Sequence, residues 1–190
     1  MSDDLLDELW LVRHGETEWS RDGRHTSATE VVLTDQGVKV ATSLRERLEG
    51  IRFDLVLTSP RQRARRTAEL AGFPDAEVER DLAEWDYGDY EGVTTSEIRE
   101  SVPGWTVWTH PCPGGETAGQ VAIRLDRVVA RVRAQGGRCL AFGHGHASRA
   151  LASRWLEQPV ADGRLFKLDT STVSVLAFER ESPVIQRWNS

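Results

Sequence analysis

Histidine and arginine side chains stand at the ends of short apolar runs in this chain. Arg13 and His14 directly follow one run, Ser59 follows a second, and His144 follows a third. An imidazole can act as a nucleophile or carry a proton, and a guanidinium binds a pair of anionic oxygens through its planar fork of donors. If the tertiary structure brings these segments together, they suit chemistry on a phosphorylated substrate.

The apolar runs are short and bounded by turn residues, which is typical of buried strands. They comprise residues 9–12, 55–57 and 139–142, and a closing pair of strands is predicted at residues 165–168 and 173–178. Helical patterns separate them, at residues 35–48, 60–71, 95–100, 116–134 and 147–156. We predict that Thr34 caps the first of these helices, and that Ser59 and Pro60 begin the second.

Strands separated by helices predict an α/β fold, here a three-layer α/β/α sandwich with a largely parallel central sheet. We expect residues 1–190 to form a single domain, because a chain of this length buries a substantial core and shows no linker or repeat. In such sheets, ligands bind beyond the carboxyl ends of the strands. The three strand ends that carry Arg13, Ser59 and His144 should therefore converge on one crevice.

Charge and hydropathy exclude several classes of protein. The net charge of −6 disfavours a general nucleic-acid binder, and no apolar run is long enough to cross a bilayer. The first residues are acidic where a secretory signal would be basic, so a cytoplasmic location is expected. Cys112 and Cys139 share no short spacing, and we expect two free thiols.

Five segments carry motifs of a known family. They are Arg13-His14-Gly15-Glu16-Thr17, Leu33-Thr34-Asp35-Gln36-Gly37, Ser59-Pro60-Arg61-Gln62-Arg63-Ala64 with Thr67-Ala68, Glu84-Trp85-Asp86-Tyr87-Gly88 with Glu91-Gly92, and Gly143-His144-Gly145. These motifs occur in the same order as in the histidine phosphatase superfamily, which the chain therefore resembles. That superfamily includes phosphoglycerate mutases, acid phosphatases and sugar bisphosphatases. The resemblance spans roughly residues 9–155. Within the superfamily, the sequence is most similar to the branch of small bacterial acid phosphatases and fungal sedoheptulose bisphosphatase. The resemblance implies a phosphoglycerate mutase-like fold.

The resemblance implies a phosphatase that transfers the phosphoryl group of a small-molecule ester first to His14. It further implies that Arg13, Arg63 and His144 clamp the phosphate, and that Glu84 protonates the leaving group. A bound anion would favour a cationic form of His144. No metal and no cofactor are expected, because arginines would supply the positive charge that divalent ions supply elsewhere.

The same resemblance implies further contacts to the substrate. Ser20, Thr26 and Gly145 are expected to contact it. The family usually has asparagine at the position of Ser20, and a hydroxyl reaches less far than an amide. Arg149 aligns with a residue that could hold a second phosphate, and a surface arginine on the first turn of a helix is the equal alternative.

Several other polar residues have structural explanations that compete with functional ones. Glu16 is expected to be a hydrogen-bonding partner rather than a catalyst. His146 is expected to line a pocket, since no third residue is spaced to complete a metal site with it. His25 and His110 are open between surface residues and lid contacts. Three arginines are expected on the solvated face of a helix, namely Arg61, Arg65 and Arg66. Four aromatic side chains could form either a pocket rim or core, namely Trp85, Tyr87, Trp105 and Trp108.

Other functions compete with hydrolysis. A cofactor-dependent phosphoglycerate mutase must enclose its phosphohistidine. Such mutases tend to be longer and to have E-R-H-Y-G where this chain has Glu84-Trp85-Asp86-Tyr87-Gly88. A non-catalytic phospho-ligand binding module of the same fold would have lost the nucleophile, the clamp or the acid, and this chain keeps all of them. No phosphopeptide groove is evident, so a protein-tyrosine phosphatase ranks below a small-molecule enzyme. Tryptophans in loops could form a homodimer surface.

Overall fold

A six-stranded sheet forms the centre of the molecule in the computed structural model, which describes residues 7–190. The acidic residues 1–6, on which the expected location rested, lie outside the described part. The strand order is β3-β2-β4-β1-β5-β6. The strands are β1 (Glu8–Arg13), β2 (Leu55–Thr58), β3 (Glu77–Val78), β4 (Arg138–Gly143), β5 (Val173–Glu179) and β6 (Ser182–Arg187).

The pairing confirms the expected α/β fold with a largely parallel sheet. Strands β3, β2, β4 and β1 pair in parallel, and β5 and β6 complete the sheet in the antiparallel sense. In β1 and β4 the central residues are all buried, as expected for strands that are covered on both faces.

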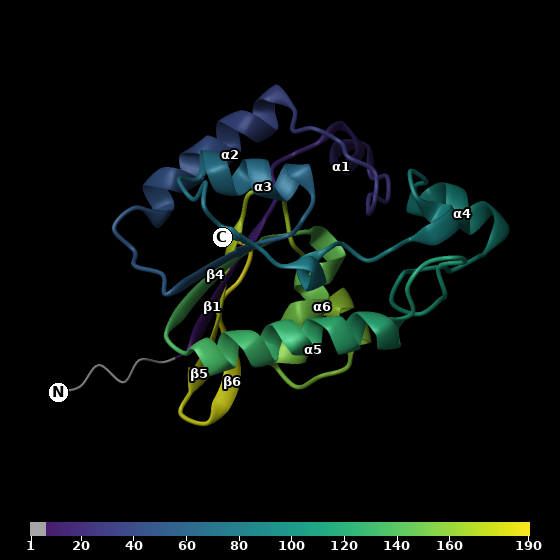
Figure 1. Cartoon of the computed structure of the whole chain (residues 1–190). Helices are drawn as coiled ribbons and strands as arrows, with labels where there is room; N and C mark the ends of the chain where they lie inside the picture. Colours follow the sequence, from purple (N-terminus) through teal and green to yellow (C-terminus); the bar gives the residue numbers. More distant parts are fainter. Residues whose placement is uncertain (1–6) are drawn as a thin grey trace.

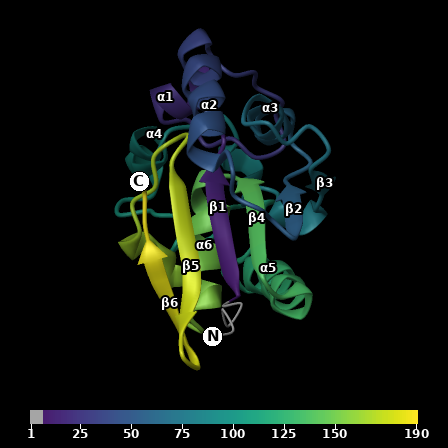
Figure 2. The ribbon, with the colours of Figure 1, turned by 90° about the vertical axis from the view of Figure 1, so that its left-hand side faces the viewer.

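Helices form the two outer layers. On one face lie α2 (Asp35–Leu48) and α3 (Gln62–Leu70), and on the other lie α5 (Ala118–Gln135) and α6 (Gly145–Trp155) (Figures 1 and 2). Alternation along β1 divides the core accordingly. Leu9 and Leu11 join the cluster around α5 and α6, whereas Trp10 and Val12 join the cluster around α2.

Local signals set the ends of these helices. Thr34 accepts a hydrogen bond from the Gly37 amide, which confirms it as the N-cap of α2. Helix α5 begins after a capping box at Thr117 and ends at Gly136, whose φ of 68° suits glycine. Its predicted apolar face is buried at every expected position, namely Val121, Leu125, Val128, Val129 and Val132.

Three local predictions were wrong. Ser59 and Pro60 lie before α3, whose N-cap is Arg61, because the Ser59 hydroxyl is committed to a distant histidine. Residues 165–168 are not a strand: Leu165 ends a 3-10 helix, η3 (Val160–Leu165), and residues 166–168 are irregular. The partner of β5 is instead β6, an edge strand that is half exposed and contains a proline, so its apolar pattern is weak.

Short elements surround the carboxyl end of the parallel strands. They are α1 (Glu18–Asp22), α4 (Thr95–Ser101) and the 3-10 helices η1 (Arg80–Leu82) and η2 (Gly88–Tyr90). Figure 1 shows α1 and α4 at the same end of the molecule. Of the aromatic side chains in this region, Trp85, Tyr87 and Trp105 are core residues, whereas Trp108 is only partly buried.

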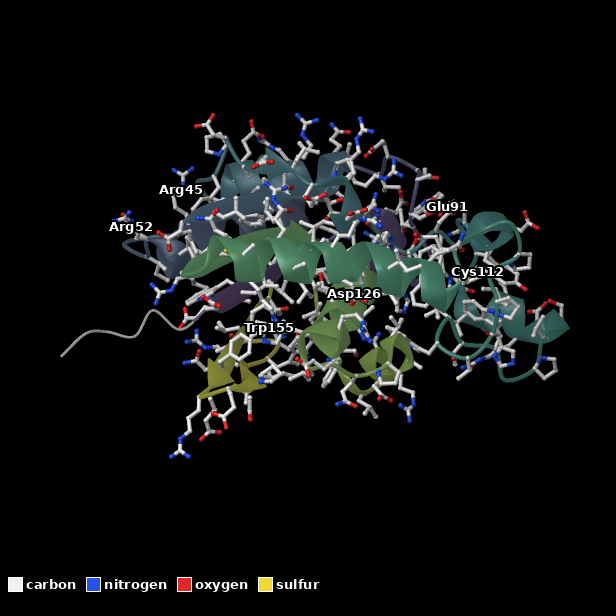
Figure 3. The ribbon with its side chains drawn as sticks, turned by 60° about the horizontal axis from the view of Figure 1, so that its bottom comes forward. Arg45, Arg52, Glu91, Cys112, Asp126 and Trp155 are labelled. Carbon is white, nitrogen blue, oxygen red and sulfur yellow. The ribbon has the colours of Figure 1, made fainter. Side chains whose placement is uncertain are left out.

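The two cysteines are buried free thiols, as predicted. Burial raises the pKa of both Cys112 and Cys139 to about 11, so neither is a reactive thiolate near neutrality. Figure 3 shows Cys112 beyond the N-terminal end of α5, far from the sheet. Within the described residues, the helices are too short or too polar to span a bilayer.

Gly37 is a test of how α2 supports the loop after β1. A Cβ at this position would lie 2.2 Å from the Glu16 carbonyl oxygen, a backbone atom that cannot easily move. We expect Gly37→Ala to lower the free energy of unfolding by about 3 kcal/mol, the upper range for overpacking. The measurement is urea unfolding.

Gly119 on α5 provides the matched control. A Cβ there meets nothing closer than 3.9 Å. Gly119→Ala should therefore raise the free energy of unfolding by about 0.5–1 kcal/mol, through helix propensity alone. Equal effects of the two substitutions would show that the contact with Glu16 is unimportant.

Candidate active site

Two histidines meet at the carboxyl edge of the sheet. Strands β1 and β4 are parallel neighbours, and Arg13 pairs in register with Gly143. The next residues, His14 and His144, are therefore side by side, with ring centroids 5.2 Å apart. Both side chains are buried: 5% of His14 and 0% of His144 is exposed to solvent. The sheet register thus explains why motifs 130 residues apart in the chain form one site.

His14 is held as a neutral imidazole. Its Nδ1 lies 2.7 Å from the Gly15 carbonyl oxygen, so Nδ1 carries the proton and Nε2 has the free electron pair. Burial, followed by the charges of Arg63 and Arg13, holds the pKa of His14 well below its ordinary value of 6.5. An unprotonated Nε2 at neutral pH is what a nucleophile requires.

His144 is fixed by Ser59, which was predicted both to cap a helix and to lie at the same crevice. Its Nε2 lies 2.7 Å from the Ser59 hydroxyl, which follows β2. Burial and the charge of Arg63 also hold the pKa of His144 well below 6.5. The unliganded site therefore contains a neutral His144, and the expected cationic form applies only when an anion is bound.

Two guanidinium groups lie near these imidazoles, and in the part of the chain that the structure describes neither has a carboxylate partner. Arg13 donates to the Leu168 carbonyl oxygen at 2.6 Å. Arg63 is 1% exposed and donates to the carbonyl oxygens of the loop at residues 26–29. Burial lowers the pKa of both arginines, although a guanidinium keeps its charge in proteins. Carbonyl acceptors leave that positive charge available to an anion.

Each of the three residues predicted to clamp phosphate keeps a buried nitrogen that finds no hydrogen-bond partner within residues 7–190. These nitrogens are Arg13 Nε, Arg63 Nε and His144 Nδ1. Buried polar atoms are nearly always paired, so three unpaired nitrogens around one imidazole indicate a place for ligand oxygens. Their arrangement suits a phosphoryl group next to His14 Nε2.

Glu84 lies on the opposite side of the site and is only 8% exposed. Its carboxylate accepts backbone N–H groups of Trp85, His146 and Ala147, at 2.9, 3.1 and 2.7 Å. The last two belong to the first turn of α6, whose N-cap, His144, offers no side-chain bond. Glu84 therefore caps α6 from a different segment and is held firmly in place.

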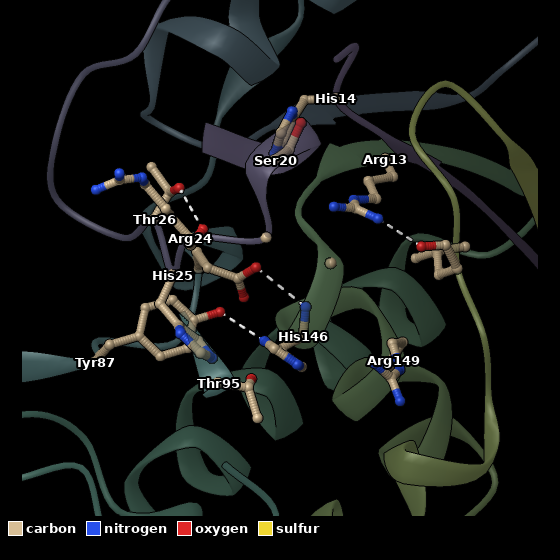
Figure 4. A pocket seen from close by; sticks show the side chains of 14 residues that line it. Arg13, His14, Ser20, Arg24, His25, Thr26, Tyr87, Thr95, His146 and Arg149 are labelled. Carbon is tan, nitrogen blue, oxygen red and sulfur yellow. Dashed lines mark hydrogen bonds between the residues drawn. The ribbon is translucent and has the colours of Figure 1, made fainter. Parts of the chain in front are cut away.

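A cavity of about 180 Å3 joins these groups (Figure 4). Seven of the predicted site residues line it, namely Arg13, His14, Ser20, Thr26, Glu84, Gly145 and Arg149. Arg63 and His144 do not line it and are almost completely buried. Of the three residues predicted to clamp phosphate, Arg13 thus lines the cavity itself.

The hydroxyl groups of Ser20 and Thr26, both predicted to contact the substrate, already have hydrogen-bond partners inside the protein. Ser20 Oγ donates to the Thr17 carbonyl oxygen and accepts from the Thr17 amide, which closes the cap of α1. Thr26 Oγ1 donates to the Arg24 carbonyl oxygen. Both line the cavity, yet their donors are engaged, so their part in ligand binding stays a prediction.

The outer wall of the cavity contains residues for which the sequence allowed more than one role. His25 and His146 stack at 6.0 Å, and His146 Nδ1 lies 2.7 Å from the Tyr87 hydroxyl. His146 thus lines the pocket as predicted, and burial keeps its pKa well below 6.5. Arg149 also lines it, with its guanidinium bonded to the Gly163 and Arg164 carbonyl oxygens rather than in solvent.

Other candidates lie away from the chemistry. Glu16 accepts a hydrogen bond from the Thr34 hydroxyl, in line with its structural interpretation. His110 is outside the cavity and bonds to Thr109. Arg65 and Arg66 are exposed, whereas Arg61 is half-buried and donates to the Ala28 carbonyl oxygen. Over residues 7–190, no group of three or more His, Cys, Asp or Glu side chains is placed to hold a metal ion.

The chain belongs to the histidine phosphatase superfamily (branch 1), whose sequence model matches residues 9–190. The motif-based prediction of the family is therefore confirmed. Two relatives with named activities are similar to this chain over most of its length. An acid phosphatase of Mycobacterium tuberculosis is 48% identical, over 90% of this chain and 86% of its own length. Sedoheptulose 1,7-bisphosphatase of Saccharomyces cerevisiae is 34% identical, over 76% of this chain and 66% of its own length.

Chain length does not separate this protein from all mutases. A 2,3-bisphosphoglycerate-dependent phosphoglycerate mutase of Methylobacterium is 33% identical, over 94% of this chain and 90% of its own length. The alignment with this mutase therefore spans most of both chains. Among solved structures, the product of a Mycobacterium tuberculosis open reading frame superposes with a TM-score of 0.91 at 44% identity, with 96% of each chain covered.

The neutral state of His14 can be measured directly. We expect an NMR titration of its imidazole to show no proton uptake at pH 6.5, because burial, Arg63 and Arg13 all lower its pKa. An unfolded chain would bind that proton at about 6.5. The folded state therefore loses stability as pH falls below 6.5, towards the lowered pKa. A midpoint at or above 6.5 would contradict this account of the site.

Proposed function

We propose that this protein is a phosphomonoesterase that hydrolyses a small phosphorylated metabolite through a phosphohistidine on His14. The observation that carries the proposal is the set of unpaired buried nitrogens of Arg13, Arg63 and His144 around the neutral His14. Family membership supports the same reaction type.

In the first half of the reaction, His14 Nε2 would attack phosphorus. A P–N bond forms as the P–O bond to the leaving group breaks, and both electrons of that bond go to the departing oxygen. The two guanidiniums and His144 would stabilise the charge on the equatorial oxygens. The hydrogen bond from His14 Nδ1–H to the Gly15 carbonyl oxygen supports the positive charge that develops on the ring.

Glu84 would donate a proton to the departing oxygen. Its two oxygens differ, since Oε1 accepts two of the backbone amides whereas Oε2 accepts one, at 3.1 Å. Oε2 is thus the oxygen with capacity to hold a proton and pass it on. Because Glu84 and His14 line the same cavity, the leaving group would occupy that cavity beside Glu84.

The second half reverses these roles. The Glu84 carboxylate would accept a proton from a water molecule as the water oxygen attacks phosphorus, and the P–N bond breaks to release inorganic phosphate and neutral His14. In this scheme arginine charge stabilises the transferring group, and the proposal includes no metal and no cofactor.

The substrate class follows from the cavity and from the relatives. A volume of about 180 Å3 lined by Arg149, Arg24 and two histidines fits a small polar ester such as a sugar phosphate. The acid phosphatase and the sedoheptulose bisphosphatase among the relatives agree with such a substrate. The similarity to a phosphoglycerate mutase makes phosphoryl return to a phosphoglycerate the second candidate.

A panel of phosphate esters tests the reaction. Wild-type protein in EDTA should release phosphate from p-nitrophenyl phosphate and from sugar phosphates, and His14→Ala should be at least about 1,000-fold slower, since it lacks the nucleophile. Transfer to phosphoglycerate without net release would establish the mutase instead. Absence of turnover in a folded wild type would establish a binding module.

The role of Glu84 predicts a dependence on the leaving group. Glu84→Gln keeps the shape but cannot donate the proton, so it should slow alkyl phosphates by about 100-fold or more and slow p-nitrophenyl phosphate much less. The measurement is kcat/KM over esters whose alcohols differ in pKa. A uniform loss on all esters would contradict the assignment of Glu84 as the acid.

A further inference from the structure

Arg124 is a buried arginine that lies outside the cavity of the site. It belongs to α5, and only 8% of it is exposed. Its Nε and Nη2 donate to the two carboxylate oxygens of Glu116, at 2.7 and 2.9 Å. Its Nη1 donates to the carbonyl oxygens of Asp81 and Ala83, at 2.7 and 2.8 Å. Its Nη1 therefore binds the segment that precedes Glu84, while its other two donor nitrogens bind Glu116.

Glu116 holds the segment that follows Glu84. Its Oε2 accepts the Asp86 amide at 2.9 Å, and its backbone amide donates to the Asp86 carbonyl oxygen at 2.9 Å. Its own carbonyl oxygen accepts the Trp85 indole N–H, also at 2.9 Å. The ion pair of Arg124 and Glu116 is thus bonded to residues on both sides of the proposed acid.

These bonds connect the acid to the rigid frame of the protein. The carboxylate of Glu84 is fixed on the first turn of α6, and its backbone is fixed on α5 through Arg124. The two helices are in turn joined by the ion pair of Arg154 and Asp126, and Figure 3 shows Asp126 midway along α5. Residues 83–87 contain no helix or strand, so these side chains supply the order that regular structure would otherwise give.

We propose that Arg124, together with Glu116, is a positioning residue for the general acid of this enzyme. The inference rests on the proposed function and extends it to two residues that do not touch the substrate. Proton transfer requires the donor within hydrogen-bond reach of the leaving oxygen, and a misplacement of about 1 Å can cost about 100-fold in rate. A loop released from Arg124 would lose the acid while keeping the nucleophile and the clamp.

Leaving-group dependence separates this role from a general structural one. An alcohol of low pKa departs without protonation, whereas an alkyl alkoxide needs the acid. We expect Arg124→Met to lower kcat/KM by about 30-fold for glycerol phosphate and by less than about 3-fold for p-nitrophenyl phosphate, the same selectivity as Glu84→Gln. The change should fall mainly on kcat, because the phosphate clamp is intact.

Arg131→Ala is the matched control. Arg131 lies two turns further along α5 on the same side and likewise holds two partners, Glu77 and Glu79, but neither of these adjoins the acid. Its substitution should leave the ratio of the two kcat/KM values unchanged. Arg124→Lys should restore part of the ratio, since an ammonium group keeps one donor and the charge.

The outcomes are distinct. If Glu84→Gln is selective and folded Arg124→Met is not, the positioning role is wrong and the proposed function stands. If Glu84→Gln itself shows no selectivity, the acid assignment fails first. Should Arg124→Met not fold by circular dichroism, Glu116→Gln decides by the same ratio, because it keeps the side-chain shape while weakening the bonds to Arg124 and Asp86.

Discussion

The site depends on the buried positive charge of two arginines that form no ion pair with a carboxylate among residues 7–190. Backbone carbonyl oxygens hold the terminal nitrogens of Arg13 and Arg63 and leave their positive charge in place. That charge, added to burial, keeps His14 and His144 unprotonated and so preserves a nucleophile. In the proposed reaction, a phosphoryl dianion would supply the counter-charge. The same buried charge would then both bind the anion and keep His14 ready to attack.

Strand pairing and loop contacts position the two histidines and the buried arginines relative to one another. Parallel pairing of β1 with β4 sets the two imidazoles side by side, and Ser59 at the end of β2 fixes the second. The loop at residues 26–29 lies between two anchors. Arg63 binds its carbonyl oxygens, and the Glu91 carboxylate binds its amides and the Ser27 hydroxyl. Those hydrogen bonds outweigh the effect of burial and lower the pKa of Glu91, which stays ionised as a loop anchor.

The proposed nucleophile and the proposed acid are held in place by different means. His14 follows a central strand and is ordered by the sheet ladder, whereas Glu84 lies in irregular chain and is ordered by a side chain from α5 and amides of α6. The segment around Glu84 is therefore held independently of the strand that carries His14. Such a division is consistent with one family that contains phosphatases and mutases.

The sequence by itself determined the family, the buried strands of the centre and the long helix α5, because apolar periodicity, caps and short motifs are local signals. It also identified Arg13, His14, Glu84 and His144 as residues for one site. Only the tertiary structure decided which partners hold them. Ser59 takes its role from His144, 85 residues away in the chain. β6 lacks an apolar pattern, and no local signal distinguishes Arg124 from the other arginines of α5, because its partners Asp81 and Ala83 are 43 and 41 residues away. Long-range contacts of this kind leave no periodic trace in the sequence, and they are what converts a set of motifs into a site.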